Sequence, residues 1–220
     1  MTSTNGGFNA LSHGFSHDGN PGRGLCAQVV MKSTVRTAPA PRLYDPPMSV
    51  LIVCAHPDLP HSRVNAALFA AARGLPDVTT TDLYGAYPDF FIDVPAEQAA
   101  LAAHDTIVLQ HPLYWYSVPA LLKHWIDHVL LQGWAYGPGG TRLQGKRWAH
   151  ALSTGGQPAS YTAEGLHRHT LAEFLTPLHR TATLCSMRWL DPFVTPDADR
   201  LAPADIDAAA AAYRAWLQAL

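Results

Sequence analysis

Three consecutive aromatic residues, Tyr114, Trp115 and Tyr116, follow an apolar run and precede a helix-like segment in this 220-residue chain. Side chains that face a core recur every three or four residues in a helix and every second residue in a strand. Three aromatics in a row fit neither period, so we expect them in a loop. There they would offer flat apolar surface beside backbone amides, which suits a planar ligand.

A second loop with chemical potential reads "HPDLPHSRVN", residues 56–65, and places Ser62 and Asn65 at the start of a predicted helix. The free N–H groups and the dipole of a helix N-terminus favour an anion. The alternative is that Ser62 only caps the helix and His56 is a hydrogen-bonded histidine at a strand end. The chain lacks GxGxxG and GxxxxGK[ST], which argues against the usual dinucleotide fold and a P-loop.

A third loop, "STGGQPASY" at residues 153–161, contains two adjacent glycines that let the main chain approach a planar ligand closely. An anion site, an aromatic wall and a glycine-lined wall together suit a planar ring system that carries a phosphate. Flavin is the predicted ligand. The alternative is an ordinary core with loops that bind nothing.

The elements that must position these loops follow from the apolar pattern. Strands are predicted at 49–55, 78–84, 106–110, 147–154 and 181–187, and helices at 63–74, 95–105, 118–131 and 204–219, with Ser117 as the cap of the third helix. Strands that alternate with helices indicate an α/β fold with a doubly wound parallel sheet of order 2-1-3-4-5 and helices on both faces. In that order a ligand crevice opens between strands 1 and 3 at their carboxyl ends, where the three loops meet.

The composition limits the function classes. A formal net charge of −2 and the absence of a Lys/Arg run argue against nucleic acid as a partner. The three scattered cysteines indicate a reducing compartment. No apolar run approaches the roughly 18 residues of a membrane span, and the N-terminus does not read as a secretory signal, so a cytoplasmic protein is expected.

The chain is predicted to consist of an N-terminal extension and one folded domain. Residues 1–47 are rich in Gly, Ser, Thr, Asn and Pro and carry too little apolar material for a core, so we expect a flexible extension. Met48 stands directly before the first strand, so the alternative is that translation begins there and that residues 1–47 are a start-site artefact. Residues 48–220 are the predicted folded domain.

The twelve histidines do not indicate a metal site. His124 and His128 lie four apart on a predicted helix, but "HWIDH" lacks the glutamate of HExxH. His167 and His169 supply two ligands, which make no site by themselves. No metal is predicted.

Five segments in register carry a family resemblance: "HPxxxxSxxN", "HPLYWYSVPALLKHWID", "GWAYGPGG", "LQGK" and "STGG…YTAEGLH". Together they resemble the NAD(P)H quinone oxidoreductase family of flavodoxin-like proteins, and within it the ancillary flavoproteins of glutathione-regulated potassium efflux. The similarity runs from about residue 49 to about residue 193.

The resemblance implies roles for individual positions. The flavin phosphate segment would be His56, Ser62, Arg63, Val64 and Asn65; the ring loop Pro112, Leu113, Tyr114, Trp115 and Tyr116; and the second backbone cradle Ser153, Thr154, Gly155 and Gly156. Tyr161 and His167 would stabilise charge on the reduced flavin. Tyr136 would close the site from the partner subunit of a homodimer, so the substrate pocket would comprise Trp115, Tyr136, Tyr161 and His167.

The activity implied is hydride transfer from NADH or NADPH to bound FMN or FAD and then to a quinone-like acceptor. One pocket that serves both substrates in turn gives ping-pong kinetics. The alternative is a regulatory ancillary subunit of a potassium/proton antiporter, with secondary redox activity and a peripheral position on the cytoplasmic face of the inner membrane. A one-electron carrier is less expected, because such a carrier should be more acidic than −2.

Overall fold

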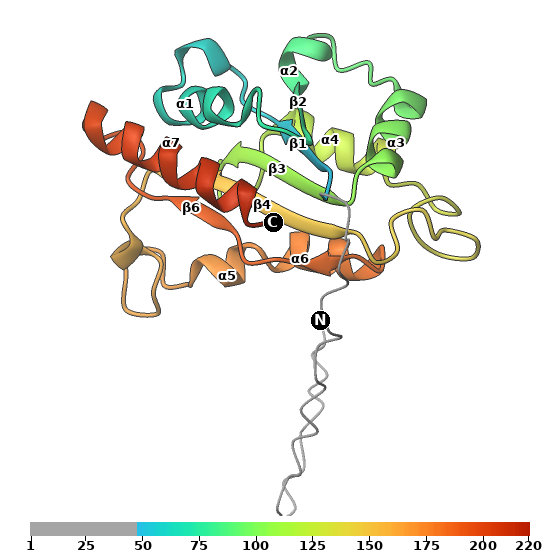
Figure 1. The fold of residues 1–220 in the computed structure, drawn as a ribbon. Helices are drawn as coiled ribbons and strands as arrows, with labels where there is room; N and C mark the ends of the chain where they lie inside the picture. Colours follow the sequence, from blue (N-terminus) through green and yellow to red (C-terminus); the bar gives the residue numbers. More distant parts are fainter. Residues whose placement is uncertain (1–47) are drawn as a thin grey trace, which may run out of the picture. The chain divides into compact units, whose positions relative to one another are not determined.

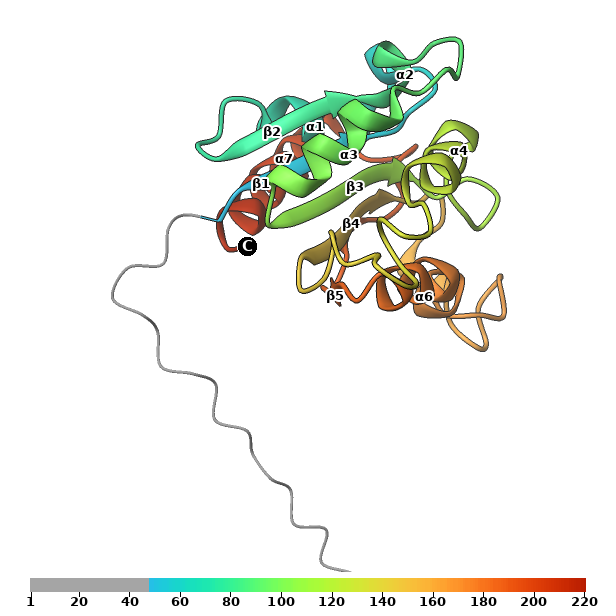
Figure 2. The same ribbon diagram turned by 90° about the vertical axis from the view of Figure 1, so that its right-hand side faces the viewer.

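A computed structural model describes residues 48–220, so the extension predicted at 1–47 lies outside the described residues. Six strands form one parallel sheet: β1 (Val50–Cys54), β2 (Val78–Asp82), β3 (Thr106–Pro112), β4 (Arg147–Ser153), β5 (Arg188–Trp189) and β6 (Phe193–Thr195). Their order is β2-β1-β3-β4-β5, with β6 also paired to β4 (Figures 1 and 2). This confirms the predicted doubly wound order.

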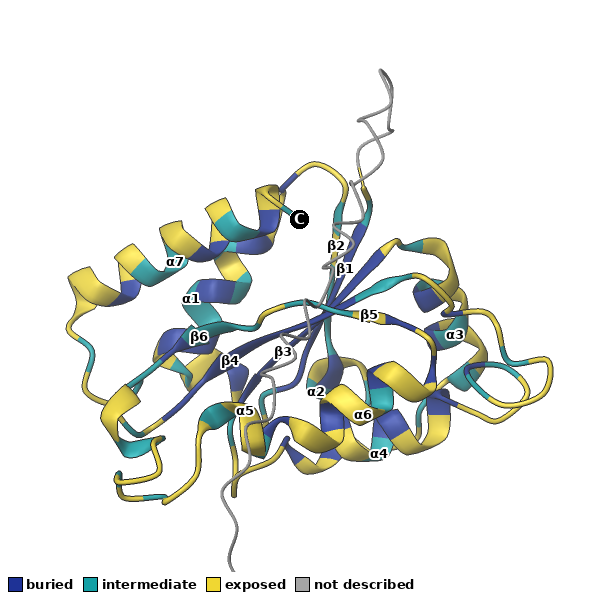
Figure 3. Cartoon of the chain, turned by 90° about the horizontal axis from the view of Figure 1, so that it is seen from below, coloured by how far each residue is buried: buried dark blue, intermediate teal, exposed yellow. Residues whose placement is uncertain are grey.

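Helices cover both faces of this sheet. One face carries α1 (Arg63–Ala72) and α7 (Pro203–Gln218), and the other carries α3 (Val94–Ala103), α4 (Ala120–Val129) and α6 (Thr176–Leu184). The short helices α2 (Leu83–Ala86) and α5 (Leu171–Phe174) lie in the connections. Figure 3 shows the buried strands between these two helical layers.

The alternation of side chains along β1 explains why the strand reads as one apolar run. Val50 and Ile52 pack in the cluster under α1 and α7, whereas Leu51 and Val53 pack in the cluster under α4. Successive strand residues point to opposite faces, so a strand that is covered on both sides must be apolar throughout.

The fifth strand predicted at 181–187 is wrong, because most of that segment belongs to α6. Leu178, Ala182 and Cys185 are the buried positions there, and their spacing of four and three is helical. The β-branched residues of "TATLCSM" suggested a strand only because the window missed the helix start at Thr176. The strand follows as β5, and β6 was not anticipated.

Ser117 is not the cap of α4. Pro119 occupies the N-cap position and makes no side-chain capping bond. The backbone of Ser117 instead pairs with that of Tyr114 and closes a turn. The other predicted helices and strands agree with the structure to within about three residues at each end. Across residues 48–220, no helix has the length and apolar character to span a membrane.

Candidate functional site

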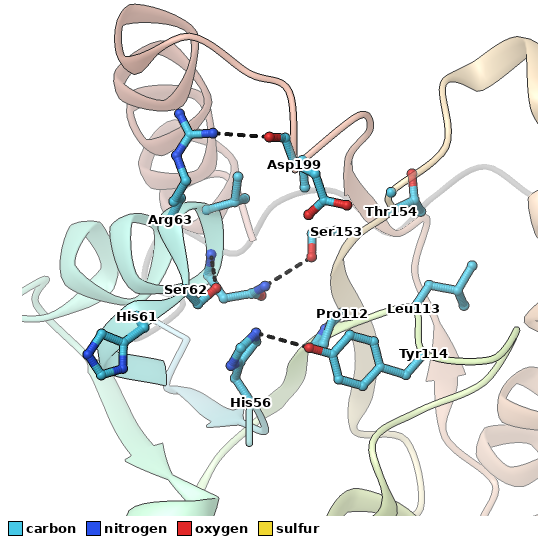
Figure 4. Close-up of a pocket in the computed structure, with 14 residues that line it drawn as sticks. His56, His61, Ser62, Arg63, Pro112, Leu113, Tyr114, Ser153, Thr154 and Asp199 are labelled. Atoms are coloured by element: carbon cyan, nitrogen blue, oxygen red, sulfur yellow. Dashed lines mark hydrogen bonds between the residues drawn. The ribbon is translucent and has the colours of Figure 1, made fainter. Parts of the chain in front are cut away.

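The three predicted loops meet at the carboxyl ends of β1, β3 and β4, around a pocket of about 470 Å³ (Figure 4). The segment between β6 and α7 completes the wall. The lining residues are His56, His61, Ser62, Arg63, Val64, Asn65, Pro112, Leu113, Tyr114, Ser153, Thr154, Gly155, Ala198 and Asp199. Parallel strands end at one edge of the sheet, so loops far apart in sequence become neighbours.

The N-terminus of α1 forms one end of the pocket. Ser62 caps the helix by accepting a bond of 3.3 Å from the Asn65 backbone N–H, so it is a cap that also lines the pocket. The N–H groups of Arg63 and Val64 have no partner inside the helix, because they belong to its first turn. This end of the pocket can therefore receive an anion.

Asn65 links the first loop to the third. Its side-chain Nδ2 donates to Ser153 Oγ over 2.9 Å, and Gln110 Nε2 donates to its carbonyl over 2.8 Å. Its Oδ1 is buried and has no partner within residues 48–220. A buried acceptor without a partner costs free energy, so a ligand that donates a hydrogen bond here would be stabilised.

The Arg63 guanidinium does not reach into the pocket. It donates to the carbonyls of Asp199 and Leu201 over 3.2 and 2.6 Å and thereby holds that segment against α1. A contact between Arg63 and an anion in the pocket would come from its backbone N–H.

Asp199, Ala198 and His61 line the pocket but were missed by the sequence reasoning. The Asp199 carboxylate points toward Thr154 (Figure 4). Its Oδ2 would lie 3.2 Å from a Cβ placed on Gly155. Asp199 follows β6, which was not predicted, and no motif marks it. Recognition of β6 was the signal that could have found it.

The aromatic triplet lies in a tight turn whose backbone is unusual. Tyr114 and Ser117 exchange two backbone hydrogen bonds of 3.2 and 2.9 Å, and the residues between them have φ of +47° (Trp115) and +62° (Tyr116). Positive φ at both central positions defines a type I′ turn, which normally takes Gly, Asn or Asp. Bulky residues there store strain of about 1–3 kcal/mol each, and such strain is often found at functional sites.

The three aromatics point in different directions. Tyr114 lines the pocket, Tyr116 stacks on Phe174 with ring centroids 5.0 Å apart, and the Trp115 side chain is 93% exposed. Only the first of the three therefore contacts the pocket directly.

His56 and Tyr114 face each other across the pocket floor. His56 Nδ1 accepts the Asp58 backbone N–H, so Nε2 carries the proton and lies 3.5 Å from the Tyr114 hydroxyl. Burial lowers the pKa of His56, against opposing effects of Asp58 and Asp82. His56 is thus a neutral, hydrogen-bonded histidine at the end of β1 that also lines the pocket.

Tyr161 and His167 lie together against the glycine loop. Their ring centroids are 4.7 Å apart, and a Cβ placed on Gly156 would lie 3.3 Å from the Tyr161 hydroxyl and 3.4 Å from His167 Nε2. A side chain at this position would be in tight contact with the Tyr161 ring edge, 3.1 Å from its Cβ, and would require the two rings to shift slightly. The catalytic role of the pair stays a prediction.

Tyr136 is not brought to the pocket. It lies between α4 and β4, where it packs on the core and bridges to Gln132. This segment precedes the amino end of β4, whereas the pocket lies at the carboxyl end. A contribution of Tyr136 from a partner subunit stays a prediction.

His124 and His128, the pair considered for a metal site, are hydrogen-bonded to backbone carbonyls. His124 Nε2 contacts the Phe90 carbonyl and His128 Nδ1 the His124 carbonyl, over 3.1 and 2.9 Å. In the part of the chain that the structure describes, no three His, Cys, Asp or Glu residues gather as a metal-binding group.

The pocket fits a planar group that carries a phosphate. It offers a helix N-terminus for the anion, the buried Asn65 Oδ1 for a donor, and a glycine loop where a Cβ would intrude. Residues 48–219 match a family described as having the flavodoxin-like fold. The chain belongs to the flavodoxin-like family.

Within this family the chain is similar to several named proteins. It is 45% identical over 168 residues to the glutathione-regulated potassium-efflux system ancillary protein KefG of Enterobacter sp., covering 76% of this chain and 92% of the relative. A solved structure of general stress protein 14 from Treponema denticola, in complex with FMN, is 40% identical with a TM-score of 0.75, covering 78% and 98%. An NADPH-quinone reductase structure from P. pentosaceus is 31% identical with a TM-score of 0.70, covering 77% and 97%.

Proposed function

We propose that this protein is an FMN-dependent NAD(P)H oxidoreductase that passes two electrons, as hydride, to a quinone or similar acceptor. The observation that carries the proposal is the convergence of an anion-binding helix end, a strained aromatic turn and a glycine loop on one pocket. The similarity to an FMN complex and to an NADPH-quinone reductase supports it.

The residues at the start of α1 would hold the flavin phosphate. The N–H groups of Arg63 and Val64 would donate to it, with Ser62 and Asn65 beside them. Tyr114 and the backbone of the 112–114 segment would line the ring system from β3, and Thr154 and Gly155 would line it from β4. The bound flavin would supply the acceptance and release of hydride.

The Tyr161–His167 pair would act on charge and protons. Hydride transfer to a flavin adds negative charge, which a Tyr O–H or a protonated imidazole can stabilise from a fixed position. The Tyr161 hydroxyl and His167 Nε2 both lie beside Gly156 in the glycine loop, so either atom could hold a proton there, although neither side chain lines the pocket itself. The ring of Phe174 packs near both, with ring centroids 6.2 Å from Tyr161 and 6.3 Å from His167.

The pocket favours FMN over FAD. Among the residues that line it there is one helix N-terminus, which suits one phosphate, and the Asp199 carboxylate also lines the pocket. A second phosphate near this carboxylate would meet like-charge repulsion.

A second candidate function rests on the name of the relatives. The KefG proteins are called ancillary proteins of a potassium-efflux system, and they match over most of their length. This chain would then be a flavoprotein subunit that contacts a membrane antiporter at the cytoplasmic face, with redox activity as a secondary property. In either role we expect a cytoplasmic homodimer, in which Tyr136 closes the partner's pocket.

The test begins with the full chain purified without added flavin. We expect a yellow protein that releases a molecule with the mass of FMN, and bleaching of the flavin band under anaerobic addition of NADH or NADPH. Steady-state assays with a water-soluble quinone then measure turnover. Protein that neither contains nor takes up a flavin would overturn the proposal, and bound flavin that NAD(P)H does not reduce would favour the ancillary role.

A further inference from the structure

A chain of hydrogen bonds among buried side chains runs beneath the ring loop and is used by none of the steps above. Trp148 Nε1 donates to His150 Nε2 over 2.9 Å, His150 Nδ1 lies 3.0 Å from His111 Nε2, and His111 Nδ1 lies 2.9 Å from the Pro112 carbonyl. All three side chains are completely buried. We call this series the Trp148–Pro112 relay.

The direction of the relay is determined by its two ends. An indole N–H can only donate and a carbonyl oxygen can only accept. His150 must therefore accept at Nε2 and donate from Nδ1, and His111 must accept at Nε2 and donate from Nδ1 to Pro112. Two neutral imidazoles satisfy every polar atom of the relay. A proton added to either ring would place two N–H groups against each other.

The relay ends at the stem of the strained turn. The peptide group that joins Pro112 to Leu113 receives the His111 bond at its carbonyl and donates from its N–H to the Ser153 carbonyl over 2.8 Å. Ser153 in turn accepts the Asn65 bond described above. The relay thus joins the ring loop after β3 to the glycine loop after β4.

We propose that His111 and His150 are positioning residues, which as neutral imidazoles hold the Pro112–Leu113 peptide, and with it the strained turn, in the shape that receives the flavin ring. The effect on flavin binding rests on the proposed function, whereas the hydrogen bonds of the relay are independent of it. Residues with strained backbone keep their conformation only where the surroundings over-determine it, and the relay supplies such a constraint.

The surroundings keep both rings neutral. Burial lowers the pKa of His111 to about 4, against a smaller opposing effect of its bond to the Pro112 carbonyl, and burial together with the neighbouring His111 lowers the pKa of His150. The other titratable groups on this face come from two of the helices that cover it. On α3, Glu97 is hydrogen-bonded to a tyrosine and a tryptophan. At α6, burial raises the pKa of the Cys185 thiol to about 11 and His179 packs on Trp189, whereas the buried residues of α4 are all apolar.

The relay can be tested without flavin. Nitrogen-15 NMR of the full chain distinguishes protonation at Nδ1 from protonation at Nε2 in each imidazole. We expect both His111 and His150 to carry the proton on Nδ1 at pH 7. An Nε2–H tautomer in either ring overturns the relay, whatever the protein binds.

A pair of variants tests the positioning role. Trp148→Phe removes the N–H that blocks protonation of His150 Nε2. Trp189→Phe makes the same change in a ring that packs 5.1 Å from His150, for which no hydrogen bond to the relay is present. The readout is the pH at which half of the bound FMN is released, measured by flavin fluorescence and normalised to each variant at pH 8.

The midpoint of FMN release should move upward in Trp148→Phe by about one pH unit, the scale on which one hydrogen bond changes a protonation equilibrium. It should stay at the wild-type value in Trp189→Phe. Equal midpoints in the two variants would overturn the positioning role. If Trp148→Phe does not fold, the tautomers measured by NMR in the wild type decide whether the relay exists. A wild type that binds no FMN contradicts the proposed function, and the same NMR measurement then still tests the relay.

Discussion

Lowering the pH from 7 to 4 should destabilise the fold, because two histidines are buried in their neutral form. His111 is completely buried, and its pKa falls from 6.5 to about 4. His150 shifts in the same direction, through burial and the neighbouring His111. In the unfolded chain both rings recover an ordinary pKa, so the unfolded state binds more protons than the folded state over this range.

The sign and size of the effect follow from that difference. The contribution of His111 is intact above pH 6.5 and is lost as the pH falls toward its folded pKa of about 4. The loss from His111 alone is roughly 3 kcal/mol, against a total stability of about 5–15 kcal/mol for a typical domain. His150 adds to it with the same sign.

Urea unfolding of the apoprotein at pH 7, 6, 5 and 4.5, followed by far-UV circular dichroism, measures this dependence. The free energy of unfolding should fall steadily over the series. His111→Gln lowers stability at pH 7 because it removes the buried bonds, but its pH dependence should be shallower, since one titrating ring is gone. A wild-type free energy that stays constant from pH 7 to 4.5 would refute the reasoning.

Three further predictions concern the site. Ser62→Ala and Asn65→Ala should each weaken FMN binding about tenfold or more in a fluorescence titration, since a lost bond to a charged group costs roughly 1.5–3 kcal/mol; unchanged affinity would place the phosphate elsewhere. Tyr161→Phe and His167→Gln should retain flavin but slow its reduction by NAD(P)H about 10- to 1000-fold in stopped-flow experiments, with losses that do not multiply in the double variant; wild-type rates in both would remove the pair from catalysis. Trp115→Gly should raise the free energy of unfolding by about 1 kcal/mol, because φ at this exposed residue is +47° and glycine adopts it without strain; a lower urea midpoint would contradict the stored strain.

The amino-acid sequence by itself determined the order of the first four strands and the place of the pocket. Continuous apolar runs at 49–55 and 106–110 are typical of strands that are covered on both faces, and helical segments between them indicate parallel crossovers. Once the strands are parallel, their carboxyl ends share one edge, so the loops at 56–65, 111–117 and 153–161 had to meet there. These are local patterns combined with a general rule of chain topology.

The tertiary structure alone decided the partners of individual side chains. The Arg63 guanidinium binds carbonyls at residues 199 and 201, and the Trp148–Pro112 relay joins residues about forty positions apart. Neither contact has a periodic signature, because each depends on where two distant elements come to lie. The segment at 181–187 shows the same limit: its residues suit a strand locally, and burial of Leu178, Ala182 and Cys185 on one stripe makes it a helix. Short-range pattern specifies an element's type only when packing agrees with it, and packing is a property of the whole fold.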